Sequence, residues 1–153
     1  MSSCANCFFE DKFCKNINGR GLDDCPTTEN QKEIDVAMLK YEQSEYKRFS
    51  REAARQEGSG YNHDGDGDEY ACKTRLQETV GFCKRMNYKK LGLVFCIGLQ
   101  HEASILNRIL QTNGFEVTSV VCKVGNIKKE GFGIEKESKI NPEKYETMCN
   151  PIA

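Results

Sequence analysis

The sequence feature that most constrains the fold is a nearly unbroken apolar run at residues 91–97, Leu-Gly-Leu-Val-Phe-Cys-Ile. A run without polar alternation is typical of a parallel strand that is covered on both faces. Apolar residues then recur at helical spacing through residues 101–113, and Gly114 supplies a helix stop. A second strand is predicted over residues 115–121. Because parallel strands need a crossover connection, we expect one parallel βαβ unit.

Two helical stretches are predicted before this unit. Apolar residues recur at mostly helical spacing through residues 28–57, and Gly58-Ser59-Gly60 ends that pattern. The second stretch covers residues 69–86 and carries a stripe on one face, made of Cys72, Leu76, Val80 and Cys83. We therefore expect Cys72 and Cys83 to be core residues. Beyond the βαβ unit, Pro142–Glu146 is a candidate start of another helix.

Residues 1–28 contain four cysteines, few aliphatic side chains and several turn formers, so this segment has no predicted hydrophobic core. The cysteines are Cys4, Cys7, Cys14 and Cys25. Four thiolates in a tetrahedral, closed shell are typical of structural zinc, whose binding supplies the free energy of folding in small modules. An iron–sulfur cluster uses the same ligands, and spacing alone does not separate it from zinc.

The acidic segment between the two helical stretches resembles a calcium loop only in part. Asp64, Asp66 and Asp68 alternate as the first ligands of an EF-hand do. Counting from Asp64, however, Glu69 falls where the loop needs glycine, and Arg75 falls where it needs a bidentate glutamate. We therefore expect a solvated acidic turn that caps the following helix.

Composition narrows the class of protein. The chain has 22 Lys and Arg against 23 Asp and Glu, so we expect neither a nucleic-acid nor an anionic-membrane partner. No stretch approaches the roughly 18 apolar residues of a membrane span, and the N-terminus lacks the pattern of a signal peptide. We expect a cytoplasmic protein. In a reducing compartment, the nine cysteines favour metal ligation or thiol chemistry over disulfides.

A second group of cysteines is predicted at the end of the parallel strands. Cys96 lies near the end of the first strand, and Cys122 follows the second. Ligands bind at this edge of open α/β sheets, and Cys149 is a third candidate for it. These three residues could bind a metal or an iron–sulfur cluster, or one could be a thiolate nucleophile beside Lys123. The alternative is that they are apolar filler, because free cysteine is often buried.

Several runs of this sequence resemble the microbial proteins grouped as Domain of Unknown Function 1847, which are described as metal-binding. The resemblance rests on the cysteine cluster ending in Cys25-Pro26, on Phe95–Leu99 with Glu102-Ala103, and on Gly114–Val117, Cys122–Gly125 and Glu146–Ile152. The resemblance implies that the protein binds a metal, but it does not indicate which reaction, if any, the protein catalyses. Members of that family continue past the position of Ala153, so the chain resembles a C-terminally truncated member that lacks part of its sheet.

Together these observations predict an α/β protein in three parts. Residues 1–28 form a cysteine-rich zinc knuckle, residues 29–88 a helical connector, and residues 89–153 a partial three-layer domain with a parallel βαβ unit. The leading hypothesis is a zinc-binding cytoplasmic protein of unknown biochemical role. The alternative is an iron–sulfur or thiol-dependent redox protein or enzyme whose site lies at the strand ends. No catalytic residue, substrate or protein partner is identified.

Overall fold

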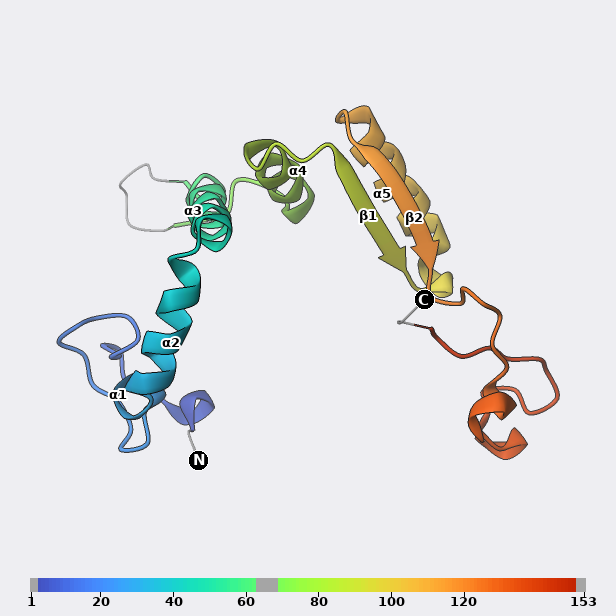
Figure 1. The fold of residues 1–153 in the computed structure, drawn as a ribbon, viewed down its shortest axis with the longest axis horizontal. Helices are drawn as coiled ribbons and strands as arrows, with labels where there is room; N and C mark the ends of the chain where they lie inside the picture. Colours follow the sequence, from blue (N-terminus) through green and yellow to red (C-terminus); the bar gives the residue numbers. More distant parts are fainter. Residues whose placement is uncertain (1–2, 63–68, 151–153) are drawn as a thin grey trace. The chain divides into compact units, whose positions relative to one another are not determined.

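The computed structural model describes residues 3–62 and 69–150. The chain divides into two compact units, Met1–Arg55 and Gln56–Ala153. Figure 1 labels the helices and strands of both units. The acidic residues 64–68 lie outside the described part of the chain, so the expected acidic turn stays a prediction.

The first unit contains short helices and irregular loops. Its elements are the 3₁₀ turn η1 (Cys4–Asn6) and the helices α1 (Pro26–Glu29), α2 (Gln31–Tyr41) and α3 (Ser44–Gly58), the last of which continues into the second unit. The helical stretch expected over residues 28–57 is confirmed, but it is divided among three helices. Asn30 leaves the helical conformation at φ −109° and ψ 39°, and asparagine favours such helix-terminal positions.

The described residues of the first unit, 3–55, include no buried apolar side chain. Phe8 is 86% exposed and Ile17 is 93% exposed. The hydrophobic effect is the main favourable contribution to folding, and this unit hardly uses it. The expectation that the cysteine-rich segment lacks a hydrophobic core agrees with this burial pattern.

The helix α4 (Arg75–Arg85) begins later than the sequence pattern predicts. Thr74 caps it: its hydroxyl accepts from the Gln77 backbone N–H at 3.3 Å, and the Gln77 side chain accepts from the Thr74 N–H at 2.8 Å. Cys83 is buried, as expected. The core position expected for Cys72 is wrong, because Cys72 precedes this cap, is exposed, and donates its backbone N–H to the Gly60 carbonyl at 2.8 Å.

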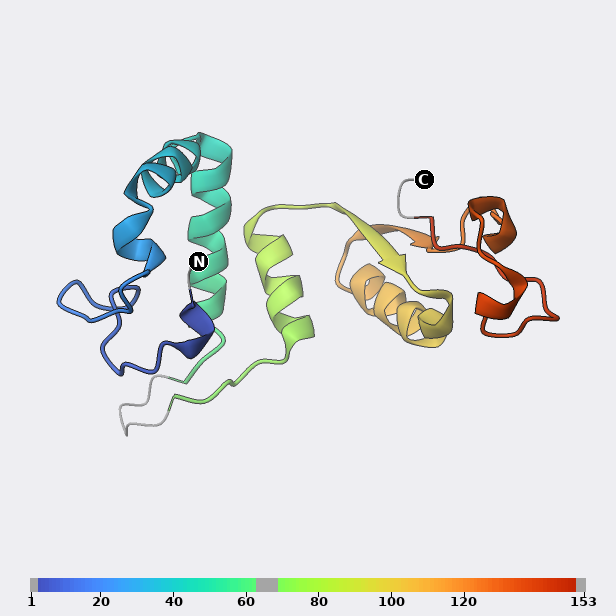
Figure 2. The same cartoon turned by 90° about the horizontal axis from the view of Figure 1, so that it is seen from below.

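The expected βαβ unit is confirmed. It consists of β1 (Lys90–Phe95), the 3₁₀ turn η2 (Ile97–Leu99), α5 (Gln100–Thr112) and β2 (Glu116–Val121). The two strands are parallel neighbours, in register from Lys90 beside Glu116 to Phe95 beside Val121. Gly114 ends the helix with a positive φ of 89°, a conformation that costs glycine little. Figure 2 shows α5 running alongside both strands.

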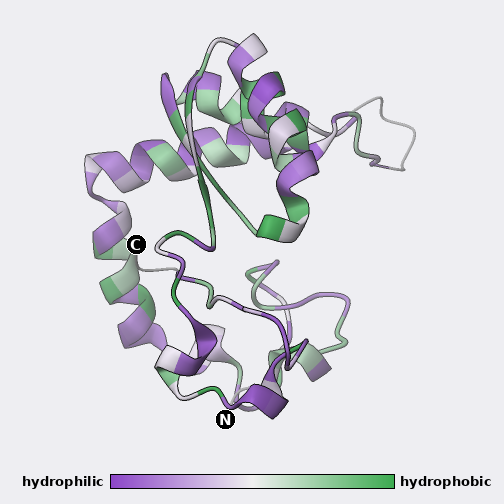
Figure 3. Ribbon diagram, turned by 90° about the vertical axis from the view of Figure 1, so that its right-hand side faces the viewer, coloured by the Kyte–Doolittle hydropathy of each residue, from purple (hydrophilic) through white to green (hydrophobic). Residues whose placement is uncertain are grey.

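The hydrophobic core of the second unit lies where α4, α5 and the sheet meet. Its centre is the cluster of Cys83, Leu110 and Phe115, with Val80, Leu91, Leu106 and Val117 packed against it. Burial alternates along β1, so one face of the strand packs inward while Val94, on the other face, stays 77% exposed. Figure 3 shows hydrophobic residues in the second half of both strands. The described chain is therefore a mixed α/β protein with one sheet face covered.

Residues 122–150 are irregular apart from two 3₁₀ turns, η3 (Lys129–Phe132) and η4 (Lys136–Ser138). The helix expected to begin at Pro142 is wrong. Instead, the Asn141 side chain accepts a hydrogen bond from the Glu143 backbone N–H at 3.2 Å, which closes a local turn. None of the helices in the described ranges has the length and apolar character needed to cross a membrane.

We predict that Leu110→Ala lowers the free energy of unfolding by about 2 to 5 kcal/mol, the usual effect of truncating a buried leucine. Leu110 is at the centre of the only cluster of buried apolar residues described in this chain. Urea unfolding followed by circular dichroism measures the change. Ile105→Ala on the same helix is the control, because Ile105 is exposed. Equal effects of both substitutions would contradict this assignment of the core.

Candidate functional site

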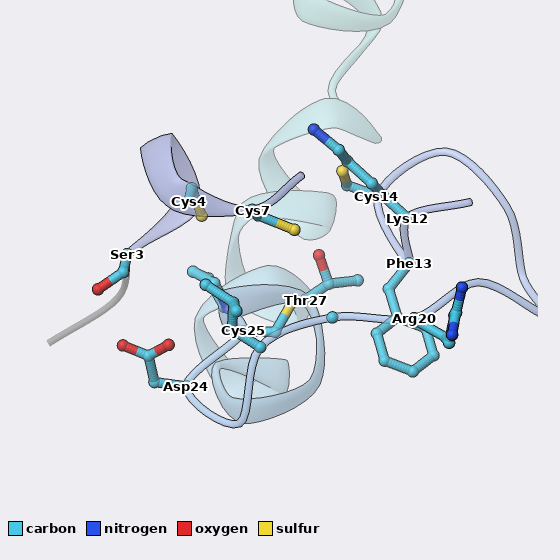
Figure 4. A pocket seen from close by; sticks show the side chains of 13 residues that line it. Ser3, Cys4, Cys7, Lys12, Phe13, Cys14, Arg20, Asp24, Cys25 and Thr27 are labelled. Atoms are coloured by element: carbon cyan, nitrogen blue, oxygen red, sulfur yellow. The ribbon is translucent and has the colours of Figure 1, made fainter. Parts of the chain in front are cut away.

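The four N-terminal cysteines line one pocket, with a volume of about 100 Å³. Figure 4 shows the side chains of Cys4, Cys7, Cys14 and Cys25 around it. The turn η1 positions the first two, because the Cys7 backbone N–H donates to the Cys4 carbonyl at 3.1 Å. Cys4 and Cys14 are exposed, and Cys7 and Cys25 are half-buried.

A tight loop positions Cys14. The Phe13 N–H donates to the Arg20 carbonyl at 3.1 Å, and the Arg20 N–H donates to the Asp11 carbonyl at 2.8 Å. This pairing draws the two sides of the loop so close that a Cβ on Gly19 would lie 2.4 Å from the Lys12 carbonyl carbon. Glycine at this position is therefore what allows the loop to close.

Cys25 is held at the start of α1. Its carbonyl accepts from the Thr28 and Glu29 backbone N–H groups at 3.1 and 2.9 Å, and from the Thr28 hydroxyl at 3.0 Å. Gly21 packs directly against its side chain, since a Cβ added there would lie 3.1 Å from the Cys25 Sγ. The Cys25 thiol is thus fixed by its own backbone and by the neighbouring chain.

The pocket gathers the four cysteines without assembling them into a finished ligand set. Within residues 3–62 and 69–150, no three Cys, His, Asp or Glu side chains are close enough to hold a metal ion. Lys12 and Arg20 also line this pocket.

The strand-end cysteines lie as the sequence predicts. Phe95 and Val121 are the last paired residues of the sheet, so Cys96 and Cys122 follow at the same edge. The Cys122 N–H donates to the Phe95 carbonyl at 2.8 Å, which extends the pairing by one residue. Cys96 is exposed, and Cys122 is half-buried. Neither cysteine is therefore a fully buried apolar residue, which was the alternative interpretation of these positions.

Cys149 joins this edge, as predicted. Its Sγ lies 3.8 Å from the Sγ of Cys122. The Asn150 backbone N–H donates to the Cys122 carbonyl at 2.8 Å, and the Asn150 side chain donates to the Val124 carbonyl at 3.2 Å. Gly125 adopts a φ of 88° in the turn that follows Cys122, a conformation that costs glycine little.

Charged residues that the sequence analysis did not single out hold the Cys149 segment in place. Glu146 accepts from Lys129 Nζ at 2.5 Å and from the backbone N–H groups of Asn141 and Ile140 at 2.6 and 3.3 Å. The Lys129 hydrogen bond, followed by the Asn141 N–H, lowers the pKa of Glu146 to about 2. Lys123, expected to favour a thiolate, donates its ammonium to the Thr147 carbonyl.

A second ion pair stabilises the same region. The Lys139 ammonium, only 4% exposed, donates to Glu130 at 2.8 Å and to the Lys144 carbonyl at 2.6 Å. The Lys139 hydrogen bond also lowers the pKa of Glu130. A nearly buried ammonium needs such partners, because an unpaired buried charge is costly. No spacing rule in the sequence indicates these pairs.

The fold and these thiols define a cysteine-rich α/β protein with one parallel βαβ unit. The family described as Protein of unknown function (DUF1847) matches residues 25–153, and the chain belongs to that family. The match begins at Cys25, so Cys4, Cys7 and Cys14 lie outside the matched range. The strand-end cysteines lie within it.

One similar protein is Uncharacterized protein MJ0455 of Methanocaldococcus jannaschii. It is 55% identical to this chain over 83 residues. The alignment covers 54% of this chain and 41% of that protein, so the match spans less than half of the relative's length. No solved structure gives a significant match.

We predict that the Glu146 carboxylate stabilises the fold at neutral pH and loses this effect in acid. Its pKa falls from 4.5 to about 2 on folding, so its contribution is complete above pH 4.5 and disappears as the pH falls toward 2. Thermal unfolding should show a lower melting temperature for Glu146→Gln than for the unchanged protein at pH 7, with the gap shrinking below pH 4.5. Glu143→Gln, at an exposed ion pair, is the control. A gap that stays constant to pH 2 would contradict the assignment.

Proposed function

We propose that this chain is a metal-binding protein in which Cys4, Cys7, Cys14 and Cys25 hold one zinc ion in a structural site. The observation that carries the proposal is the common pocket: the two cysteines at the ends of η1, the loop cysteine Cys14, and Cys25 at the start of α1 all line the same cavity. Four thiolates at about 2.3 Å from the metal complete a tetrahedral shell, which leaves no open position for catalysis.

The burial pattern supports this role. Residues 3–55 include no buried apolar side chain, so the first unit needs another source of folding free energy. Structural zinc supplies about 10 to 16 kcal/mol in small modules. The ligand set closes when the four side chains rotate and their loops adjust. This is the zinc knuckle expected for residues 1–28.

Solvent exposure favours zinc over the iron–sulfur alternative. Cys4 and Cys14 are exposed. Zinc is redox-inert and tolerates such a setting, whereas the potential of an iron–sulfur cluster depends on its shielding from solvent.

All nine cysteines are free thiols, which supports the expected cytoplasmic, reducing location. The exposed Val94 face of β1 supports the expected three-layer domain, because parallel sheets are normally covered on both faces.

We predict that Cys7→Ser reduces the zinc content from about one ion per chain to near zero, because three thiolates remain of a four-thiolate shell. Elemental analysis of protein purified without oxygen measures the metal, and circular dichroism follows the loss of structure in the first unit. Cys72→Ser is the matched control, since Cys72 is an exposed cysteine that does not line the pocket.

Two results would contradict the proposal. Cys7→Ser protein that retains a full equivalent of zinc would exclude Cys7 as a ligand. Brown protein that contains iron and labile sulfide would replace zinc with the iron–sulfur alternative.

A further inference from the structure

We propose that Cys122 and Cys149 form a dithiol–disulfide redox centre at the strand-end edge, which exchanges electrons with a disulfide substrate. Their sulfurs lie 3.8 Å apart although the residues are 27 positions apart in the sequence. The proposal does not depend on the N-terminal metal site, because it uses different residues in the other unit of the chain.

The backbone brings these two residues within bonding range. The Met148 N–H donates to the Ile127 carbonyl at 2.8 Å, and the Asn150 N–H donates to the Cys122 carbonyl at 2.8 Å. The two sulfur atoms, now 3.8 Å apart, have to approach by less than about 2 Å to reach the S–S bond length of about 2.05 Å. Closing the bond therefore requires rotation of the two side chains and little movement of the backbone.

Both thiols are accessible to a reagent. Cys149 is exposed and Cys122 is half-buried, in contrast to Cys83 in the core. The exposed thiol is the better placed to attack a substrate, and the less exposed thiol is placed to resolve the product. The Lys129–Glu146 ion pair and the Lys123 bond to the Thr147 carbonyl hold the two segments together in the reduced protein.

The exchange is balanced. The Cys149 thiolate attacks one sulfur of the substrate disulfide, forms a mixed disulfide and expels the other substrate sulfur as a thiolate. The Cys122 thiolate then attacks the Cys149 sulfur and releases the second substrate thiolate. The protein loses two electrons and two protons, and the substrate disulfide gains them as two thiols. In a cytoplasmic setting such a bond is transient and serves redox chemistry.

A metal site at the same edge is the rival interpretation. Tetrahedral thiolates on zinc also lie about 3.8 Å apart, given a bond of about 2.3 Å. Such a site needs at least a third ligand, and Cys96 follows the neighbouring strand. Within the described ranges, however, no third Cys, His, Asp or Glu side chain completes a group with this pair. The pair alone is sufficient for disulfide exchange.

The test uses the 153-residue protein as purified without oxygen, and oxidised glutathione as the probe. Reduced protein is equilibrated in buffers of increasing oxidised-to-reduced glutathione ratio, alkylated, digested with trypsin and analysed by mass spectrometry. We expect one linked pair of peptides, residues 109–123 with residues 145–153, lighter by two hydrogen atoms than the two free peptides. Two equivalents of glutathione should be released for each link formed.

Variants make the result specific. Cys122→Ser should stop at the mixed disulfide, with one glutathione attached to Cys149. Cys72→Ser should form the link as the unchanged protein does, and so should Cys7→Ser, whatever its metal content. The zinc proposal is tested by the metal content of Cys7→Ser, and the redox proposal by the link between Cys122 and Cys149, so failure of one can be distinguished from failure of the other.

Three results would overturn the proposal. Cys122 and Cys149 could both remain free to alkylation at every glutathione ratio, or Cys149 could link to Cys96 instead. Alternatively, native mass spectrometry could show a second metal ion that protects the pair and is lost in Cys149→Ser.

Discussion

The parallel pairing of β1 with β2 is the interaction on which the second unit depends. Its register ends at Phe95 beside Val121, which brings Cys96 and Cys122 to one edge. The helix α5 lies along the pair and contributes Leu110 to the core. A register shift of one residue would turn the inward side chains of the shifted strand outward, so burial of one face fixes the position of the edge cysteines.

The two units rely on different sources of stability. The second has a small apolar core and a C-terminal segment held by ion pairs, and these pairs place Cys149 beside Cys122. The first has no described apolar core but gathers four cysteines around one pocket. This contrast supports the two proposals: a metal site in the first unit, where four cysteines line a pocket and no apolar side chain among the described residues is buried, and thiol chemistry in the second, where Cys149 lies at an accessible edge.

Much of the second unit could be predicted from the sequence, because an apolar run, a helical stripe and Gly114 each indicate a local structure. The strand-end position of Cys122 follows from the same pattern. The core position predicted for Cys72 is wrong because the spacing of Cys72 continues the apolar stripe of α4, whereas the Thr74–Gln77 capping box starts the helix only after Cys72. The Glu146 contacts could not be foreseen, because they join residues up to 17 positions apart through tertiary structure.

X-ray absorption at the zinc edge, on full-length protein purified without oxygen, tests the central claim most directly. Zinc in the N-terminal pocket predicts a shell of four sulfur atoms at about 2.3 Å. A shell dominated by nitrogen or oxygen at about 2.0 to 2.1 Å would contradict the assignment of Cys4, Cys7, Cys14 and Cys25 as the ligands.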